Sequence, residues 1–230
     1  MAEEPENTVA SFRRAEEIGV DEVETDVRIS ADGQLLMLHD ATLDRTAADA
    51  SGQGLGPVAE LDWSTIRQVD VGNGERVPTL FEMYEATESF IQLEIKDLAV
   101  IDSLVDFFAE HTDLAERTML TGFSVDAMAS VAEKMPQIPR GIITSTWTKI
   151  AEYAGGPEGL IKETSSSRLH SGREGMTSDD VERLHEAGYQ LHCWPTRTKD
   201  DLQQALELGV DGTTSDDPRT LKVWLAELTG

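Results

Sequence analysis

The stretch that decides the fold is SDDVERLHEAGYQLHCWPTRTKDDLQQALELGVDGTTSDDP, residues 178–218. It contains two helical patterns, at 178–187 and 199–208, and a glycine and then a β-rich run follow each of them. A glycine that ends a helix and leads directly into a strand is typical of a chain that alternates helices with strands. Such alternation predicts a parallel sheet covered by helices.

The same alternation extends over most of the 230 residues. At this number of repeats we predict an α/β fold of the TIM type, a (β/α)8 barrel. A doubly wound sheet is the alternative, but no glycine-rich dinucleotide fingerprint supports it. The predicted strands are 20–29, 35–39, 90–96, 118–123, 140–144, 167–170, 189–194 and 211–215. The predicted helices are 8–18, 79–87, 98–111, 125–135, 178–187, 199–208 and 218–228.

The length suits a single barrel domain that spans residues 1–230. Residues 41–78 interrupt the alternation, because they are rich in Asp, Gly, Ser and Pro and hold one short helical stretch at 61–69. We interpret them as a small insertion after the strand that ends at His39, near the mouth of the barrel, where functional loops concentrate.

The charge of the chain excludes some classes of function. Asp and Glu number 44 against 19 Lys and Arg, which gives a net charge of −25. We interpret this excess as an adaptation to a salt-rich cytoplasm, as in halophiles. It argues against nucleic-acid binding, which needs a basic surface, and against stable membrane association. No apolar run is long enough to span a membrane, no signal peptide is visible, and the one cysteine favours a reducing compartment, so we expect a cytoplasmic protein.

Two predicted strands carry carboxylates on one face. Side chains alternate along a strand, so VETDVRI at 23–29 places Glu24 and Asp26 opposite its apolar residues. IQLEIK at 91–96 does the same with Glu94 and Lys96. In a parallel barrel these faces converge, and three carboxylates without a cation would repel one another. All-oxygen ligands suit a hard cation, Mg²⁺ or Ca²⁺. The alternative is a solvated acidic strand face, which is common in so acidic a chain.

Asp32-Gly33 is a tight-turn signal between the predicted strands 20–29 and 35–39. A histidine, His39, is the last residue of the second strand. His39 lies beside Asp40 and in phase with the carboxylates, so it is a candidate for moving protons near neutral pH. The alternative is a structural histidine.

Six motifs occur in order along the chain: PENT at 5–8, VETDVRISADGQLLMLHD at 23–40, LDRT at 43–46, VPTLFEM at 77–83, LEIK at 93–96 and GVDGTTSDDP at 209–218. Together they resemble the glycerophosphodiester phosphodiesterases, which are metal-dependent barrel enzymes. The resemblance implies that Glu24, Asp26 and Glu94 bind the metal, that His39 is one of two catalytic histidines and that Lys96 lies beside the phosphate. The implied reaction is hydrolysis of a glycerophosphodiester to glycerol 3-phosphate and an alcohol.

The chain departs from that family at its start and on two later strands. The family opens with a strand ending in His-Arg-Gly, which this sequence does not contain, so we expect a barrel without its first strand. We favour a chain that begins after this strand over a protein that has lost the reaction, or one in which His170 or His192 substitutes. The family's Ser-Phe corresponds to TGFS near 118–123, and its Trp-Thr-x-Asn to WPTR at 194–197. Trp194 either lines the mouth and contacts the alcohol group or is an ordinary core residue.

The function predicted from the sequence is therefore a metal-dependent phosphodiesterase of lipid metabolism, acting on a small-molecule glycerophosphodiester. The alternatives are an inactive barrel that binds a phosphorylated ligand and a related phosphodiesterase acting on phospholipid headgroups. The sequence does not choose between Mg²⁺ and Ca²⁺, and it specifies neither the alcohol group nor the oligomeric state.

Overall fold

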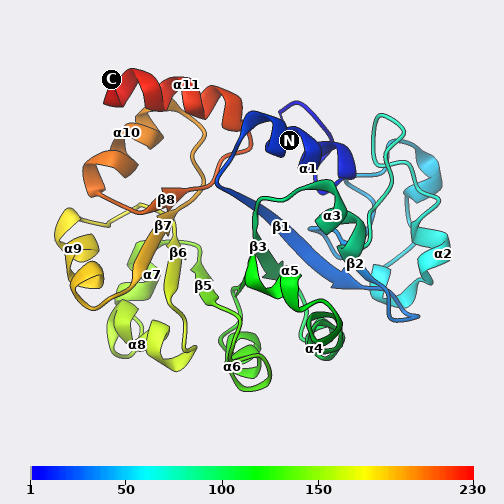
Figure 1. Cartoon of the computed structure of the whole chain (residues 1–230), viewed down its shortest axis with the longest axis horizontal. Coiled ribbons are helices and arrows are strands. Elements are labelled where there is room, and N and C mark those ends of the chain that lie inside the picture. The colour runs from blue at the N-terminus through cyan, green and yellow to red at the C-terminus, as the bar shows by residue number, and fades with distance from the viewer. Residues whose placement is uncertain (1) are drawn as a thin grey trace. The chain divides into compact units, whose positions relative to one another are not determined.

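The computed structural model describes residues 2–230, apart from the side chain of Ala151 (Figure 1). Contacts between residues group the chain into two compact units, one ending at Met119 and the other running from Leu120 to Gly230. Each unit has its own strands, helices and buried residues.

The first unit is organised around one long strand, β1 (Glu22–Ile29). β1 pairs in parallel with β3 (Phe90–Ile95), in a register that sets Asp26 opposite Glu94. Its carboxyl end also pairs antiparallel with β2 (Leu35–Met37), so β1 and β2 form a hairpin. Gly33 has a φ of 89° in the connecting turn, a conformation that glycine adopts without strain.

The helices of the first unit begin where side chains cap them. Thr8 caps α1 (Val9–Ile18) and Thr79 caps α3 (Leu80–Ala86), both through capping boxes. Gly19 ends α1 in the left-handed conformation. The remaining elements of this unit are η1 (Ala50–Gly52), η2 (Val58–Glu60), α2 (Trp63–Ile66), α4 (Val100–Glu110) and α5 (Thr112–Glu116).

Residues 41–78 contain η1, η2 and α2 and have an apolar cluster of their own. Six buried side chains from this segment pack against Leu36 of β2 and against Leu38, which follows that strand. The six are Leu43, Val58, Ile66, Val69, Val71 and Val77. The helical stretch expected at 61–69 is the shorter α2. This cluster fixes the segment on the hairpin that carries the candidate histidine.

The second unit contains a parallel run of short strands. Its strands are β4 (Thr118–Gly122, which crosses the boundary between the units), β5 (Arg140–Thr144), β6 (Arg168–Ser171), β7 (Gln190–Cys193) and β8 (Gly212–Thr213). Each pairs in parallel with the next, from β4 to β8. The helices are α6 (Val125–Lys134), α7 (Trp147–Ala151), α8 (Gly156–Glu163), α9 (Ser178–Glu186), α10 (Lys199–Leu208) and α11 (Pro218–Thr229).

Helices α7 and α8 were not predicted from the sequence. Helix α8 begins with Gly156 and Pro157 after its N-cap Gly155, and these three residues resemble a loop in the sequence. In the structure Pro157 lies in the first turn of α8. Backbone amides in the first turn have no acceptor within the helix, so a proline there costs no hydrogen bond. Leu160 and Ile161 are the buried residues that hold this helix in place.

A pair of imidazole rings occupies one face of the second unit's sheet. His170 of β6 pairs in register with His192 of β7, and their ring centroids lie 5.2 Å apart. The neighbouring strands carry glycine at the adjoining positions, because a Cβ on Gly141 would lie 2.8 Å from His170 Nε2 and one on Gly212 would lie 2.6 Å from the His192 ring. Both glycines therefore provide the room that the rings occupy.

We predict that Gly141→Ala lowers the free energy of unfolding by about 1–3 kcal/mol, because the buried His170 ring has little room to move aside. Urea denaturation measures the change. In a His170→Ala background the same substitution should cost clearly less, because the clashing ring is gone. An equal cost in both backgrounds would contradict the steric explanation.

Candidate metal and catalytic site

Three carboxylates meet on one face of the first unit's sheet. Because directly paired residues of parallel strands face the same side, the register of β1 and β3 brings Asp26 next to Glu94, and Glu24 lies two positions before Asp26. One oxygen from each of the three carboxylates lies within 4.8 Å of the others. Asp26 and Glu94 are 5% and 7% exposed, whereas Glu24 is open to solvent.

Lys96 lies within this cluster. Its Nζ is 2.6 Å from Glu94 Oε1 and 3.0 Å from Asp26 Oδ1. Burial lowers the pKa of Lys96, but Asp26 and Glu94 outweigh it, so the pKa is raised and the ammonium stays charged. Burial raises the pKa of Glu94, and Lys96 only partly offsets this effect.

The donor set fits a hard divalent cation. Asp26 Oδ1 is buried and accepts no hydrogen bond of good geometry from the described residues, although it has the ion pair with Lys96. A buried carboxylate oxygen of this kind needs a further partner, and oxygen donors are those that Mg²⁺ and Ca²⁺ take. Glu24, Asp26 and Glu94 supply three such donors.

Asn7 holds the other oxygen of Asp26. Its Nδ2 donates to Asp26 Oδ2 at 2.9 Å, and its Oδ1 accepts a hydrogen bond of 2.7 Å from Thr25. In the structure Thr8 is the cap of α1, and Asn7 instead orients a candidate metal ligand.

His39 is held at two points. Its backbone oxygen accepts hydrogen bonds from Arg28 Nε and Nη2, at 3.0 and 2.8 Å. Its Nδ1 lies 2.6 Å from Asp40 Oδ1, and Asp40 Oδ2 accepts from Arg45 Nε at 2.6 Å. Arg45 in turn donates to both carboxylate oxygens of Glu6, at 2.7 and 2.6 Å. We assign the Nδ1 proton to the hydrogen bond with Asp40, which leaves Nε2 of this exposed ring as the proton acceptor.

The carboxyl of Asp40 has an unusually low pKa. Hydrogen bonds from Arg45 and then His39 outweigh its partial burial and lower the pKa from 3.8 to about 2. Asp40 therefore remains an anion over the whole range in which a histidine titrates.

We predict that Asp40→Asn lowers the stability at neutral pH, and that the difference from the unmodified protein shrinks as the pH falls. A carboxyl whose pKa is lower in the folded state stabilises the fold above its ordinary pKa of 3.8, and this contribution is lost toward the folded value of about 2. Urea midpoints measured from pH 7 to pH 2 test this. Asp106→Asn, at an exposed position of α4, serves as the matched control. A difference that stays constant with pH would contradict the assignment.

The other sequence candidates lie in the second unit. Trp194 is half-buried and meets Phe123 edge-on at 5.8 Å, and its indole Nε1 is buried with no hydrogen-bond partner among the described residues. His170 is 2% exposed, and burial, followed by the charges of His192 and Arg168, holds its pKa well below the ordinary value. His170 is therefore a neutral imidazole, and a catalytic role for His170 or His192 stays a hypothesis.

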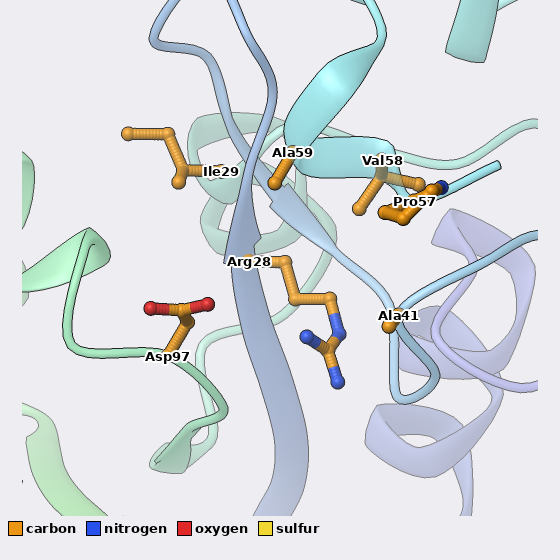
Figure 2. Close-up of a pocket in the computed structure, with 7 residues that line it drawn as sticks. All are labelled: Arg28, Ile29, Ala41, Pro57, Val58, Ala59 and Asp97. Carbon is orange, nitrogen blue, oxygen red and sulfur yellow. The ribbon is translucent and has the colours of Figure 1, made fainter.

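A small cavity lies in the first unit beside the ends of β1 and β3 (Figure 2). Its volume is about 100 Å³. The residues that line it are Arg28, Ile29, Ala41, Pro57, Val58, Ala59 and Asp97. In Figure 2, η2 supplies one wall, and Arg28 extends from β1 on the same side as Ala41.

Among residues 2–230, no helix has the length and the apolar character needed to cross a membrane.

Comparisons with known proteins identify the family to which this chain belongs. Residues 1–220 match the model of the Glycerophosphoryl diester phosphodiesterase family. A glycerophosphodiester phosphodiesterase of Caldanaerobacter subterraneus subsp. tengcongensis is 30% identical over 235 residues, covering 94% of this chain and 90% of the relative. A probable glycerophosphodiester phosphodiesterase 2 of Mycobacterium tuberculosis is 28% identical, covering 92% of this chain and 82% of the relative.

Solved structures share the fold. The structure of an Oleispira antarctica phosphodiesterase in complex with the product sn-glycerol-3-phosphate matches with a TM-score of 0.83 at 22% identity, over 98% of this chain and 93% of that one. A structure of a putative glycerophosphoryl diester phosphodiesterase from Silicibacter pomeroyi matches with a TM-score of 0.87 at 20% identity, over 97% of this chain and 89% of that one. The predicted α/β fold of the TIM-barrel type is confirmed.

Fold and relatives together define the class of this protein as a phosphodiester-cleaving enzyme on a TIM-type α/β fold. The match over residues 1–220 makes it a member of the glycerophosphoryl diester phosphodiesterase family.

Proposed function

We propose that this protein is a metal-dependent phosphodiesterase that hydrolyses glycerophosphodiesters to glycerol 3-phosphate and an alcohol. The observation that carries the proposal is the convergence of Glu24, Asp26 and Glu94 around Lys96 at the paired strands β1 and β3. The Oleispira antarctica relative, bound to its product sn-glycerol-3-phosphate, supports the same substrate class. Glycerophosphodiesters arise when phospholipids are broken down, so the proposed activity belongs to lipid metabolism.

The cation that we propose for this site is Mg²⁺ or Ca²⁺, held by Glu24, Asp26 and Glu94. A bound divalent ion would draw negative charge from the phosphate oxygens. Asn7 fixes the orientation of Asp26, so the ligand is positioned before any ion arrives.

Lys96 would bind the phosphate directly. An ammonium has three N–H donors. Lys96 donates one hydrogen bond to Glu94 Oε1 and lies 3.0 Å from Asp26 Oδ1 as an ion pair, so donor capacity is left for a phosphate oxygen. Because both carboxylates keep the ammonium charged, Lys96 supplies a positive charge in a chain whose net charge is −25.

His39 would move a proton between the ring and the reacting oxygen. Asp40 holds Nδ1, so Nε2 accepts the proton of the glycerol hydroxyl that attacks phosphorus, as the O–H bond breaks and an N–H bond forms. The glycerol oxygen bonds to phosphorus as the P–O bond to the alcohol breaks, and the leaving alkoxide takes a proton from water. The resulting hydroxide then opens the cyclic phosphate, and the protonated Nε2 returns its proton to the glycerol oxygen that leaves phosphorus. Arg28 fixes the main chain of His39 during these steps.

The test is an assay of glycerol 3-phosphate release from glycerophosphocholine and glycerophosphoethanolamine in molar salt, with Mg²⁺ or Ca²⁺ and then with a chelator. We expect release that depends on the cation. If neither diester is cleaved while glycerol 3-phosphate still binds, the protein is instead a barrel that binds a phosphorylated ligand.

A further inference from the structure

Several residues that line the cavity of Figure 2 are close in sequence to the candidate site residues. Three of its lining residues follow candidate site residues by one or two positions: Arg28 follows Asp26, Ala41 follows His39 and Asp97 follows Lys96. Arg28 links the cavity to the candidate site, because it lines the cavity and also holds the backbone oxygen of His39.

Two charged side chains give the cavity its polarity. Arg28 uses Nε and Nη2 to hold His39, whereas its Nη1 makes no hydrogen bond within residues 2–230. Asp97 accepts the Ala99 amide proton with Oδ1 at 2.9 Å, and its other oxygen has no hydrogen-bond donor in the described chain. The cavity thus offers one positively charged donor and one negatively charged acceptor.

The rest of the cavity wall is apolar. It consists of Ile29, Ala41, Pro57, Val58 and Ala59. With a volume of about 100 Å³, the cavity suits a small group. Val58 is buried in the apolar cluster of residues 41–78, whereas Ala41, Pro57 and Ala59 are exposed, so the cavity opens to solvent on this side.

We propose that this cavity binds the alcohol group of the substrate and selects a small polyhydroxy alcohol, such as glycerol, over a quaternary ammonium alcohol. A hydroxyl group both donates and accepts, so it satisfies Asp97 and Arg28 together. A cationic group gains from Asp97 but is repelled by Arg28, and it brings no donor for the carboxylate if it is fully methylated. This inference rests on the proposed function.

The test compares kcat/KM for glycerophosphoglycerol and glycerophosphocholine with the full chain and Mg²⁺. We expect a preference of about tenfold or more for glycerophosphoglycerol, the effect of hydrogen bonds to charged groups. Ala59→Leu, which fills the cavity from η2, should bring this ratio close to one. Ala31→Leu, at an exposed alanine outside the cavity, should leave the ratio unchanged.

Each outcome has a definite meaning. Equal kcat/KM for both diesters in the unmodified protein would overturn the inference, and so would a ratio that Ala59→Leu does not change, even if both activities fall. Failure to cleave any glycerophosphodiester would instead contradict the proposed function, and the inference with it.

Discussion

Glu94→Gln should reduce metal-dependent hydrolysis by about 10³-fold, because a cation at this site is expected to contribute several kcal/mol to catalysis and each 1.4 kcal/mol is a factor of ten. Glu94 is buried and lies beside Asp26, so a neutral amide of similar shape removes one charge from the cluster with little change in packing. The same substitution leaves Lys96 with one carboxylate partner fewer.

Two measurements separate this effect from a loss of folding. Calorimetric titration should show weaker binding of Mg²⁺ or Ca²⁺, and circular dichroism should show an intact fold. Glu110→Gln, at an exposed position of α4, is the matched control and should retain full activity. Unchanged turnover of the Glu94 variant at saturating cation would refute the assignment of the site.

His39→Gln is expected to lower kcat by about 10²–10⁴-fold and to leave KM nearly unchanged. The reason is that the exposed ring exchanges a proton through Nε2, whereas the backbone oxygen that Arg28 holds remains in place. The pH dependence of kcat that comes from a general base should also disappear, whereas a substitution that only disturbs the structure would leave it in place.

The matched control for this prediction is His111→Gln. His111 packs against Phe81 and Phe107 and takes no part in the network around Asp40. Full activity of the His39 variant, or an equal loss in both variants, would show that His39 has no special part in proton transfer.

The sequence predicts the carboxylate cluster because that prediction depends only on the period of a strand. Glu24 and Asp26 are two residues apart, Glu94 and Lys96 are two residues apart, and parallel pairing then brings both faces together. The hairpin follows in the same way from Asp32-Gly33 between two apolar runs.

The parts that sequence reasoning missed depend on contacts between distant residues. Arg45 and Glu6 are 39 positions apart, and Asn7 and Asp26 are 19 apart, so no local pattern pairs them. Helix α8 was missed for another reason, since its glycines and proline resemble a loop until the packing of Leu160 and Ile161 is known. Tertiary packing overrides local propensity at such places.

Glu6 and Asn7 are neighbours in the chain, yet they anchor different halves of the candidate site. Glu6 binds Arg45, which holds Asp40, while Asn7 binds Asp26. A transient opening of this one short segment would therefore release the histidine network and a candidate metal ligand in the same event. Amide hydrogen exchange around Thr8 would then report how often the enzyme visits an inactive state, and ligands that protect this segment would raise the active fraction without contacting it.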